Sequence, residues 1–132
     1  MKKILLTFTT ISIMSLAGDF QDGVKAIGEG NYKKAITLYQ KAANKGDADA
    51  QYMHGVMHYK GLGLTRNYKK AVLIWRKLAN EGHADARHIL GVMYQYGDGV
   101  RQNYSTAQEF FSQACDSGDN DGCKQYAILN QK

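Results

Sequence analysis

The chain has 132 residues, enough for one domain, and carries 17 lysines and arginines against 12 acidic residues, a net charge of +5. Its basic residues are scattered rather than gathered in a block, which disfavours a nucleic-acid-binding protein. Only two cysteines occur, so a framework of several disulfides is excluded.

The first seventeen residues have the pattern of a secretory signal peptide. Lys2 and Lys3 give a positive start, residues 4–16 form an apolar run, and small residues stand at both ends of 15–17. The run is too short to cross a bilayer, which takes about 20 residues; a buried N-terminal helix is the alternative. Without this segment the charge is 15 − 12 = +3. No second apolar run follows, so we expect no membrane insertion of the mature chain.

Seven helices and no strand are predicted in the remainder. Apolar residues recur at helical spacing, as at Phe20, Val24 and Ile27. Asn31 is a plausible N-cap because its side-chain oxygen can accept free N–H groups, and Gly46 ends a helix because glycine adopts the left-handed conformation at little cost. The predicted helices cover residues 19–27, 32–44, 48–60, 67–80, 84–96, 103–116 and 122–130.

One sequence pattern occurs three times at an interval of 36 residues. It begins as NYKKA at Asn31, NYKKA at Asn67 and NYSTA at Asn103, and the copies align without a gap. A fixed period of this length indicates a stacked array of helix pairs, in which each pair needs its neighbours to cover its apolar face.

Equivalent positions in the copies carry side chains of similar size. Alanines and glycines at fixed sites let helices approach closely, and large rings at another site can fill the space between them. The alanines are Ala35, Ala71 and Ala107, the glycines are Gly55 and Gly91, and the rings are Tyr39, Trp75 and Phe111.

These motifs resemble those of the Sel1-like repeat, a relative of the tetratricopeptide repeat with a longer loop between its helices. The second unit has GLG at 61–63, YKKA at 68–71 and ANEG at 79–82, and the third has LG at 90–91 and GDGV at 97–100. The resemblance covers residues 19–130. It implies an all-α fold, a right-handed α-solenoid of antiparallel helix pairs with about seven helices.

The two cysteines resemble those of one branch of these repeats. Cys115 and Cys123 have the C-x7-C spacing of the Helicobacter cysteine-rich (Hcp) proteins, although the pair occurs here only once. The resemblance implies a disulfide from the end of one unit to the start of the next helix. Two buried free thiols are the alternative. A closed loop of this size contributes about 2–3 kcal/mol to stability.

Relatives in that branch include penicillin-binding proteins and weak β-lactamases, so serine chemistry is the enzymatic alternative. Serine acylation of that type needs the S-x-x-K arrangement. The mature chain has only Ser105, Ser112 and Ser117, and none precedes a lysine at that spacing. We therefore expect no catalytic residues and keep weak β-lactam hydrolysis as the alternative function.

His54 and His58 are the only pair that could chelate a metal ion from one helix face. Their counterparts in the next unit are Leu90 and Tyr94, however, and both are core positions. Two packed histidines are therefore the preferred interpretation, and we expect neither a metal nor a cofactor.

The remaining function is recognition of a protein or peptide partner. In such arrays the first helices of successive units line a groove, and methionine-rich apolar surface adapts to varied partners. Packing of these methionines between helices is the alternative. The predicted partner-binding residues are Met53, Val56, Met57, Lys60, Ile89, Val92, Met93 and Tyr96.

The sequence thus predicts an exported, non-catalytic repeat scaffold that is periplasmic or secreted from a bacterium. Residues 1–17 form the signal peptide and residues 18–132 the repeat domain. Its units lie at about 19–46, 47–82 and 83–118, followed by a capping helix in 119–132.

Overall fold

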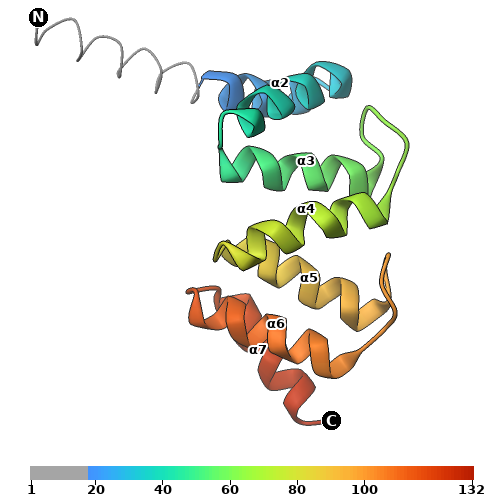
Figure 1. The fold of residues 1–132 in the computed structure, drawn as a ribbon, viewed down its shortest axis with the longest axis vertical. Coiled ribbons are helices and arrows are strands. Elements are labelled where there is room, and N and C mark those ends of the chain that lie inside the picture. Colours follow the sequence, from blue (N-terminus) through green and yellow to red (C-terminus); the bar gives the residue numbers. More distant parts are fainter. Residues whose placement is uncertain (1–17) are drawn as a thin grey trace, which may run out of the picture.

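The computed structural model describes residues 18–132, and the signal-peptide prediction for residues 1–17 lies outside them. The described part contains seven helical segments and no strand, which confirms the all-α prediction (Figure 1). The first segment is helical over residues 18–28. The others are α2 (Tyr32–Asn44), α3 (Ala48–Lys60), α4 (Tyr68–Asn80), α5 (Ala84–Tyr96), α6 (Tyr104–Asp116) and α7 (Asn120–Asn130).

The helices stack in chain order along the long axis of the molecule. Figure 1 shows the first segment and α7 at opposite ends, with each helix from α2 to α7 packed on the one before it. The loops after α3 and α5 project from the same side of the helix stack. Among residues 18–132 no helix is long and apolar enough to cross a membrane.

The second helix of each unit begins at a repeated asparagine. The Oδ1 atoms of Asn31, Asn67 and Asn103 accept the backbone N–H of the residue three positions on, at 3.2, 3.0 and 3.1 Å. Each side chain satisfies one donor that a helix start otherwise leaves unpaired. The predicted start of α2 is therefore confirmed, and α4 and α6 begin one residue later than predicted, since Asn67 and Asn103 are their N-caps.

The last helix begins two residues earlier than predicted. The side chain of Asp119 accepts the backbone N–H of Asp121 at 3.1 Å, which starts α7 at Asn120. The prediction started the helix at Gly122, whereas this glycine lies inside the first turn of α7 and is buried. A β-carbon at Gly122 would lie 2.9 Å from that of Ala114, so the helices cross closely here.

Each unit packs an aromatic ring of its second helix directly on a glycine of its first helix. The pairs are Gly23 with Tyr39, Gly55 with Trp75, and Gly91 with Phe111. A β-carbon at Gly91 would lie 2.7 Å from the ring of Phe111, closer than packed atoms come. All three rings are fully buried, so the glycine creates the space that the ring fills.

The loop after α5 lies on the preceding unit. Gly99 has φ +67°, and a β-carbon there would lie 2.6 Å from the β-carbon of Tyr68, at the start of α4. Glycine is therefore required both for its backbone conformation and for the close approach. This contact holds the loop beside the outward face of α4.

The first helical segment is anchored to α2 by a nearly buried carboxylate. Asp19 is 8% exposed, and its Oδ2 accepts a hydrogen bond from Lys45 at 2.8 Å, while Lys41 lies 3.4 Å from its Oδ1. The hydrogen bond from Lys45 holds the pKa of Asp19 below its usual value. This ion pair joins residues 26 positions apart and fixes one end of the stack.

Candidate partner-binding surfaces

Two of the eight predicted contact residues belong to the core. Met57 and Met93 are 0% exposed, so neither can touch a partner, and that part of the prediction is wrong. The reason is that α3 and α5 each lie between two helices and are buried over a wider arc than a one-sided helix. Met57 also stands seven residues after the buried Ala50, which places both on one face.

The other six residues form a strip along α3 and α5 that remains partly accessible. Lys60 and Tyr96 are exposed, and Tyr96 reaches 67%. The remaining four are half-buried and pack on the edges of the core clusters. They are Met53, Val56, Ile89 and Val92.

The two histidines of α3 pack against each other as the sequence comparison predicted. The ring centroids of His54 and His58 lie 4.8 Å apart in an edge-on arrangement. His58 is 7% exposed, and neither of its ring nitrogens has a hydrogen-bond partner among residues 18–132. Burial, the neighbouring His58 and Lys70 lower the pKa of His54 to about 4. Within residues 18–132 no group of three or more potential metal ligands converges.

His83 caps α5, a role that the sequence analysis missed. Its Nδ1 accepts the backbone N–H of Ala86 at 3.2 Å, so the proton of the neutral ring sits on Nε2 and is donated to Asp49, 3.2 Å away. One imidazole therefore starts α5 and ties it to α3. The signal was its position, because Asp47 and Asp119 cap the other first helices at the same place in the repeat.

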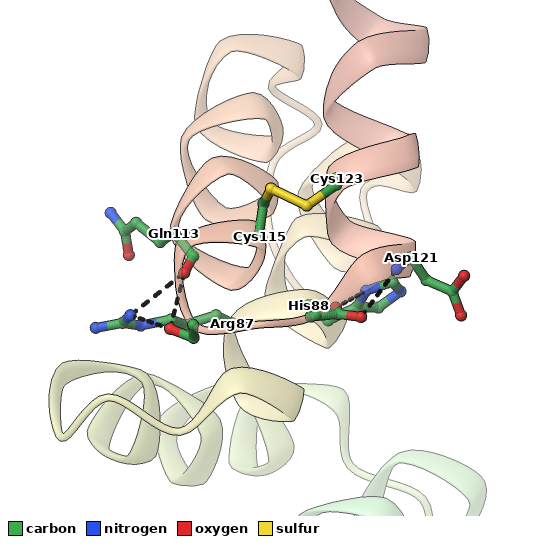
Figure 2. The surroundings of a disulfide bond; sticks show 8 residues. Arg87, His88, Gln113, Cys115, Asp121 and Cys123 are labelled. Carbon is green, nitrogen blue, oxygen red and sulfur yellow. Dashed lines mark hydrogen bonds and ion pairs between the residues drawn. A yellow bond between two sulfur atoms is a disulfide. The ribbon is translucent and has the colours of Figure 1, made fainter.

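The disulfide prediction is confirmed at the end of the stack. Cys115 near the end of α6 is bonded to Cys123 in α7, with Cα atoms 4.6 Å apart (Figure 2). The two preceding junctions use hydrogen bonds between the same repeat positions. Gln51 Nε2 donates to the carbonyl of Ala43 at 3.3 Å, and Arg87 Nε donates to that of Ala79 at 3.1 Å.

Polar contacts around the disulfide join three helices. Figure 2 shows Arg87, at the start of α5, reaching the end of α6, where its Nη1 lies 2.6 Å from Ser117 Oγ. His88 Nδ1 lies 2.6 Å from Asp119 Oδ2. Burial alone would raise the pKa of Asp119, but this contact and the N–H groups of Gly122 and Asp121 outweigh it and lower the pKa.

The serines provide no acyl-transfer arrangement in the described chain. Ser117 Oγ accepts from Arg87 and donates to the carbonyl of Gln113 at 2.9 Å. Ser105 and Ser112 lie along the outward face of α6, in a shallow recess lined with uncharged amides, Glu109 and Tyr126, with no lysine or histidine. The lysine that would act as the base in an S-x-x-K arrangement is therefore absent from this recess.

A groove of about 840 Å³ lies between α4 and the loop after α5. Its apolar lining comes from Val72, Leu73 and Val100. Lys69, Arg76 and Arg101 stand around it, and no carboxylate lines it. We refer to it as the α4 groove. The sequence analysis missed it because its second wall is the loop 99–103, whose place over α4 is set by the contact of Gly99 with Tyr68.

The chain was compared with protein-family models, with curated protein sequences and with solved structures. The family model for the Sel1 repeat matches residues 13–47, 48–83 and 84–119. A comparison with curated protein sequences finds no match.

Solved structures of longer repeat proteins superpose well. A protective antigen of uropathogenic Escherichia coli with an SLR fold has a TM-score of 0.78 and 29% identity, covering 86% of this chain and 25% of that one. A Sel1 repeat protein from Oxalobacter formigenes has a TM-score of 0.77 and 24% identity, covering 83% and 45%. This chain therefore spans a quarter of the first protein and less than half of the second.

A third structure matches over nearly its whole length. Helicobacter pylori cysteine rich protein B has a TM-score of 0.70 and 19% identity, covering 93% of this chain and 94% of that one. At this identity the likeness concerns the fold alone.

Proposed function

Because the chain belongs to the Sel1-repeat family, whose members typically act as scaffolds for protein interactions, we propose that it is an exported, non-catalytic scaffold that binds a protein or peptide partner. The α4 groove carries this proposal, because its volume suits a few side chains of a ligand. Leu73, 67% exposed in the apolar lining, is the kind of surface that a partner covers.

Export is supported by two independent features. The N-terminal seventeen residues have the composition of a signal peptide. The Cys115–Cys123 disulfide persists in oxidising compartments such as the periplasm or the extracellular space. Detection of a mature chain beginning near Gly18 outside the cytoplasm would test both together.

The strip along α3 and α5 is the second surface that we propose for partner contact. Its outer edge is formed by Lys60 and Tyr96, and its half-buried residues offer apolar area only at their tips. Unlike the α4 groove it is no well-formed recess, so it suits a broad partner surface better than an inserted side chain.

Site-specific photo-crosslinking in the native host can separate the two surfaces. A photoreactive residue at Leu73 reports on the α4 groove and one at Tyr96 on the strip, and because both side chains are 67% exposed the two probes are matched in access. Val24, 46% exposed in the first segment, serves as the control position. We expect a discrete adduct from Leu73. Adducts at all three positions in equal yield, or at none, would contradict the scaffold proposal.

An enzymatic role is tested separately on the purified mature chain. We expect no turnover of nitrocefin. Turnover that disappears in Ser112→Ala, with helicity retained, would overturn the non-catalytic part of the proposal.

A further inference from the structure

We propose that the α4 groove binds an extended segment of the partner that carries carboxylates next to apolar side chains. This inference rests on the proposed function that the chain binds a protein or peptide, and it adds the chemistry of the bound segment.

The apolar lining of the groove selects for apolar side chains. Val72 is 4% exposed and forms its base, whereas Leu73 is 67% exposed at its rim, and Val100 closes it from the loop. Binding is favoured when a ligand covers so exposed a leucine, because apolar surface is then removed from water. This part of the site is indifferent to charge.

The rim selects for negative charge. Lys69, Arg76 and Arg101 line the groove without any acidic residue, and none of them has an ion-pair partner among residues 18–132. Three cations around one recess raise the local concentration of anions, an effect that salt screens. A segment with acidic side chains supplies the missing charges.

Arg76 is held in place for such a contact. Its Nη2 donates to the hydroxyl of Tyr94, and its guanidinium lies 5.8 Å from the centre of that ring. The Tyr94 ring stacks on Phe110 of α6 at 5.7 Å. A guanidinium has five N–H donors, so several remain for a carboxylate. Fixing the side chain beforehand reduces the entropy lost on binding.

The other units show that the fold does not require these residues. In α6 the positions of Lys69, Leu73 and Arg76 are occupied by Ser105, Glu109 and Ser112. These residues line a smaller recess in which Glu109 is the one charged residue among those that the structure describes. The same thirteen-residue helix forms in both cases. The cations and the exposed leucine are therefore a property of this one groove rather than of helix stacking.

The α2 face gives the second comparison. There Thr37 and Gln40 stand where α4 has Leu73 and Arg76, so the exposed leucine and the fixed guanidinium are again absent. Only Lys33, the counterpart of Lys69, keeps its charge. If these cations served only to keep the surface soluble, we would not expect them to cluster with apolar residues in a single unit.

The test uses the mature chain and three labelled peptides of one length. In the first peptide Glu alternates with Leu, in the second Gln replaces each Glu, and in the third Lys does. Fluorescence polarisation measures their affinities at low and high salt. We expect the acidic peptide to bind at least about tenfold more tightly than the neutral one, and salt to reduce that difference.

A repeat-swapped variant assigns the binding to the groove. Lys69→Ser, Leu73→Glu and Arg76→Ser together install the residues of α6, which are compatible with the same helix. We expect a loss of about tenfold or more in affinity for the acidic peptide, with unchanged circular dichroism.

The matched control changes the net charge by the same amount on α2, the counterpart of α4 in the preceding unit. Lys33→Ser, Lys34→Ser and Thr37→Glu alter exposed residues on α2. We expect acidic-peptide binding within about twofold of the unmodified chain. Equal losses in the two variants would show a diffuse charge effect and overturn the proposal, as would equal binding of the acidic and neutral peptides.

Two further outcomes separate this inference from the function on which it rests. A Leu73 crosslink to a partner segment without acidic residues would refute the acidic ligand while leaving the scaffold function intact. Sedimentation that shows a dimer, abolished by the repeat-swapped variant, would assign the groove to a second copy of this chain and overturn the peptide proposal.

Discussion

The central pair, α4 and α5, and the terminal pair, α6 and α7, occupy equivalent junctions of the repeat but are held together differently. Around α4 and α5 a cluster of eight buried residues includes Trp75, Leu78 and Leu90. The cluster beneath α7 has only three buried members, Ala107, Phe111 and Leu129. Where the central junctions use the side-chain hydrogen bonds of Gln51 and Arg87, the terminal junction uses a disulfide.

The difference follows from the number of neighbours. A central helix is covered on two sides, so apolar burial and one hydrogen bond are enough to fix its junction. Within residues 18–132 the helix α7 packs mainly on α6, and its Ile128 is 49% exposed. A covalent bond that restricts the unfolded chain offsets this smaller burial.

Trp75 is where the central unit is most easily broken. Its ring fills the space above Gly55, and its Nε1 donates to the carbonyl of Tyr52 at 3.2 Å. We expect Trp75→Ala to lower the free energy of unfolding by about 3–5 kcal/mol because a large buried cavity forms. Urea unfolding followed by circular dichroism measures this. A loss below about 1 kcal/mol would mean that the central cluster can repack without the ring.

The disulfide is the corresponding weak point of the terminal pair. We expect the double variant Cys115→Ala, Cys123→Ala to lose about 2–3 kcal/mol, because the closed loop no longer restricts the unfolded chain. Hydrogen exchange should increase in α7 and remain unchanged in α3 and α4. Exchange that rises equally throughout the chain would show that α7 is not a separate weak point.

Acid should weaken the central unit through its histidines. Burial, His58 and Lys70 lower the pKa of His54 in the folded chain to about 4, below the value of 6.5 that applies on unfolding. The unfolded chain therefore binds the proton more readily, so this stability is fully present above pH 6.5 and is lost as the pH falls towards 4.

We expect a loss of about 1–2 kcal/mol across that range, after allowance for the part of the ring that water reaches. His54→Leu installs the residue type that Leu90 provides in the next unit. It should remove the pH-dependent stability due to His54 while leaving that due to His58. Urea midpoints at neutral and acid pH measure both proteins. Identical pH profiles would show that folding does not lower the pKa of His54.

Substitution of Arg87 should cause the smallest of these losses in the free energy of unfolding. Arg87→Ala removes the hydrogen bonds to the carbonyl of Ala79 and to Ser117, at a junction that keeps its apolar contacts. We expect a loss of about 1 kcal/mol in thermal or urea unfolding. A loss as large as that of the cysteine variant would remove the distinction between the two kinds of junction.

The repeat period made most of the fold predictable. Boundaries of six helices agree within one residue, because capping residues and terminating glycines recur at fixed places. The exposed surface was less predictable. Met57 and Met93 were assigned to it because a single core stripe was assumed for helices that are buried on two sides.

The α4 groove could not be found from sequence spacing. It depends on how closely the loop after α5 approaches α4, which the short contact of Gly99 with Tyr68 determines. Comparison of α4 with its counterparts does give a partial signal. Leu73 is an exposed leucine where the other units have Thr37 and Glu109.

The pairing of a ring with a glycine bears on how such a protein can be lengthened by design. Duplication of residues 48–83 would insert a unit that brings its own glycine and ring, Gly55 and Trp75, and therefore its own internal fit. Addition after α7 is different, because Ala127 stands at the position of Gly91. Its methyl group would meet the incoming ring, so an engineer would first have to replace that alanine with glycine.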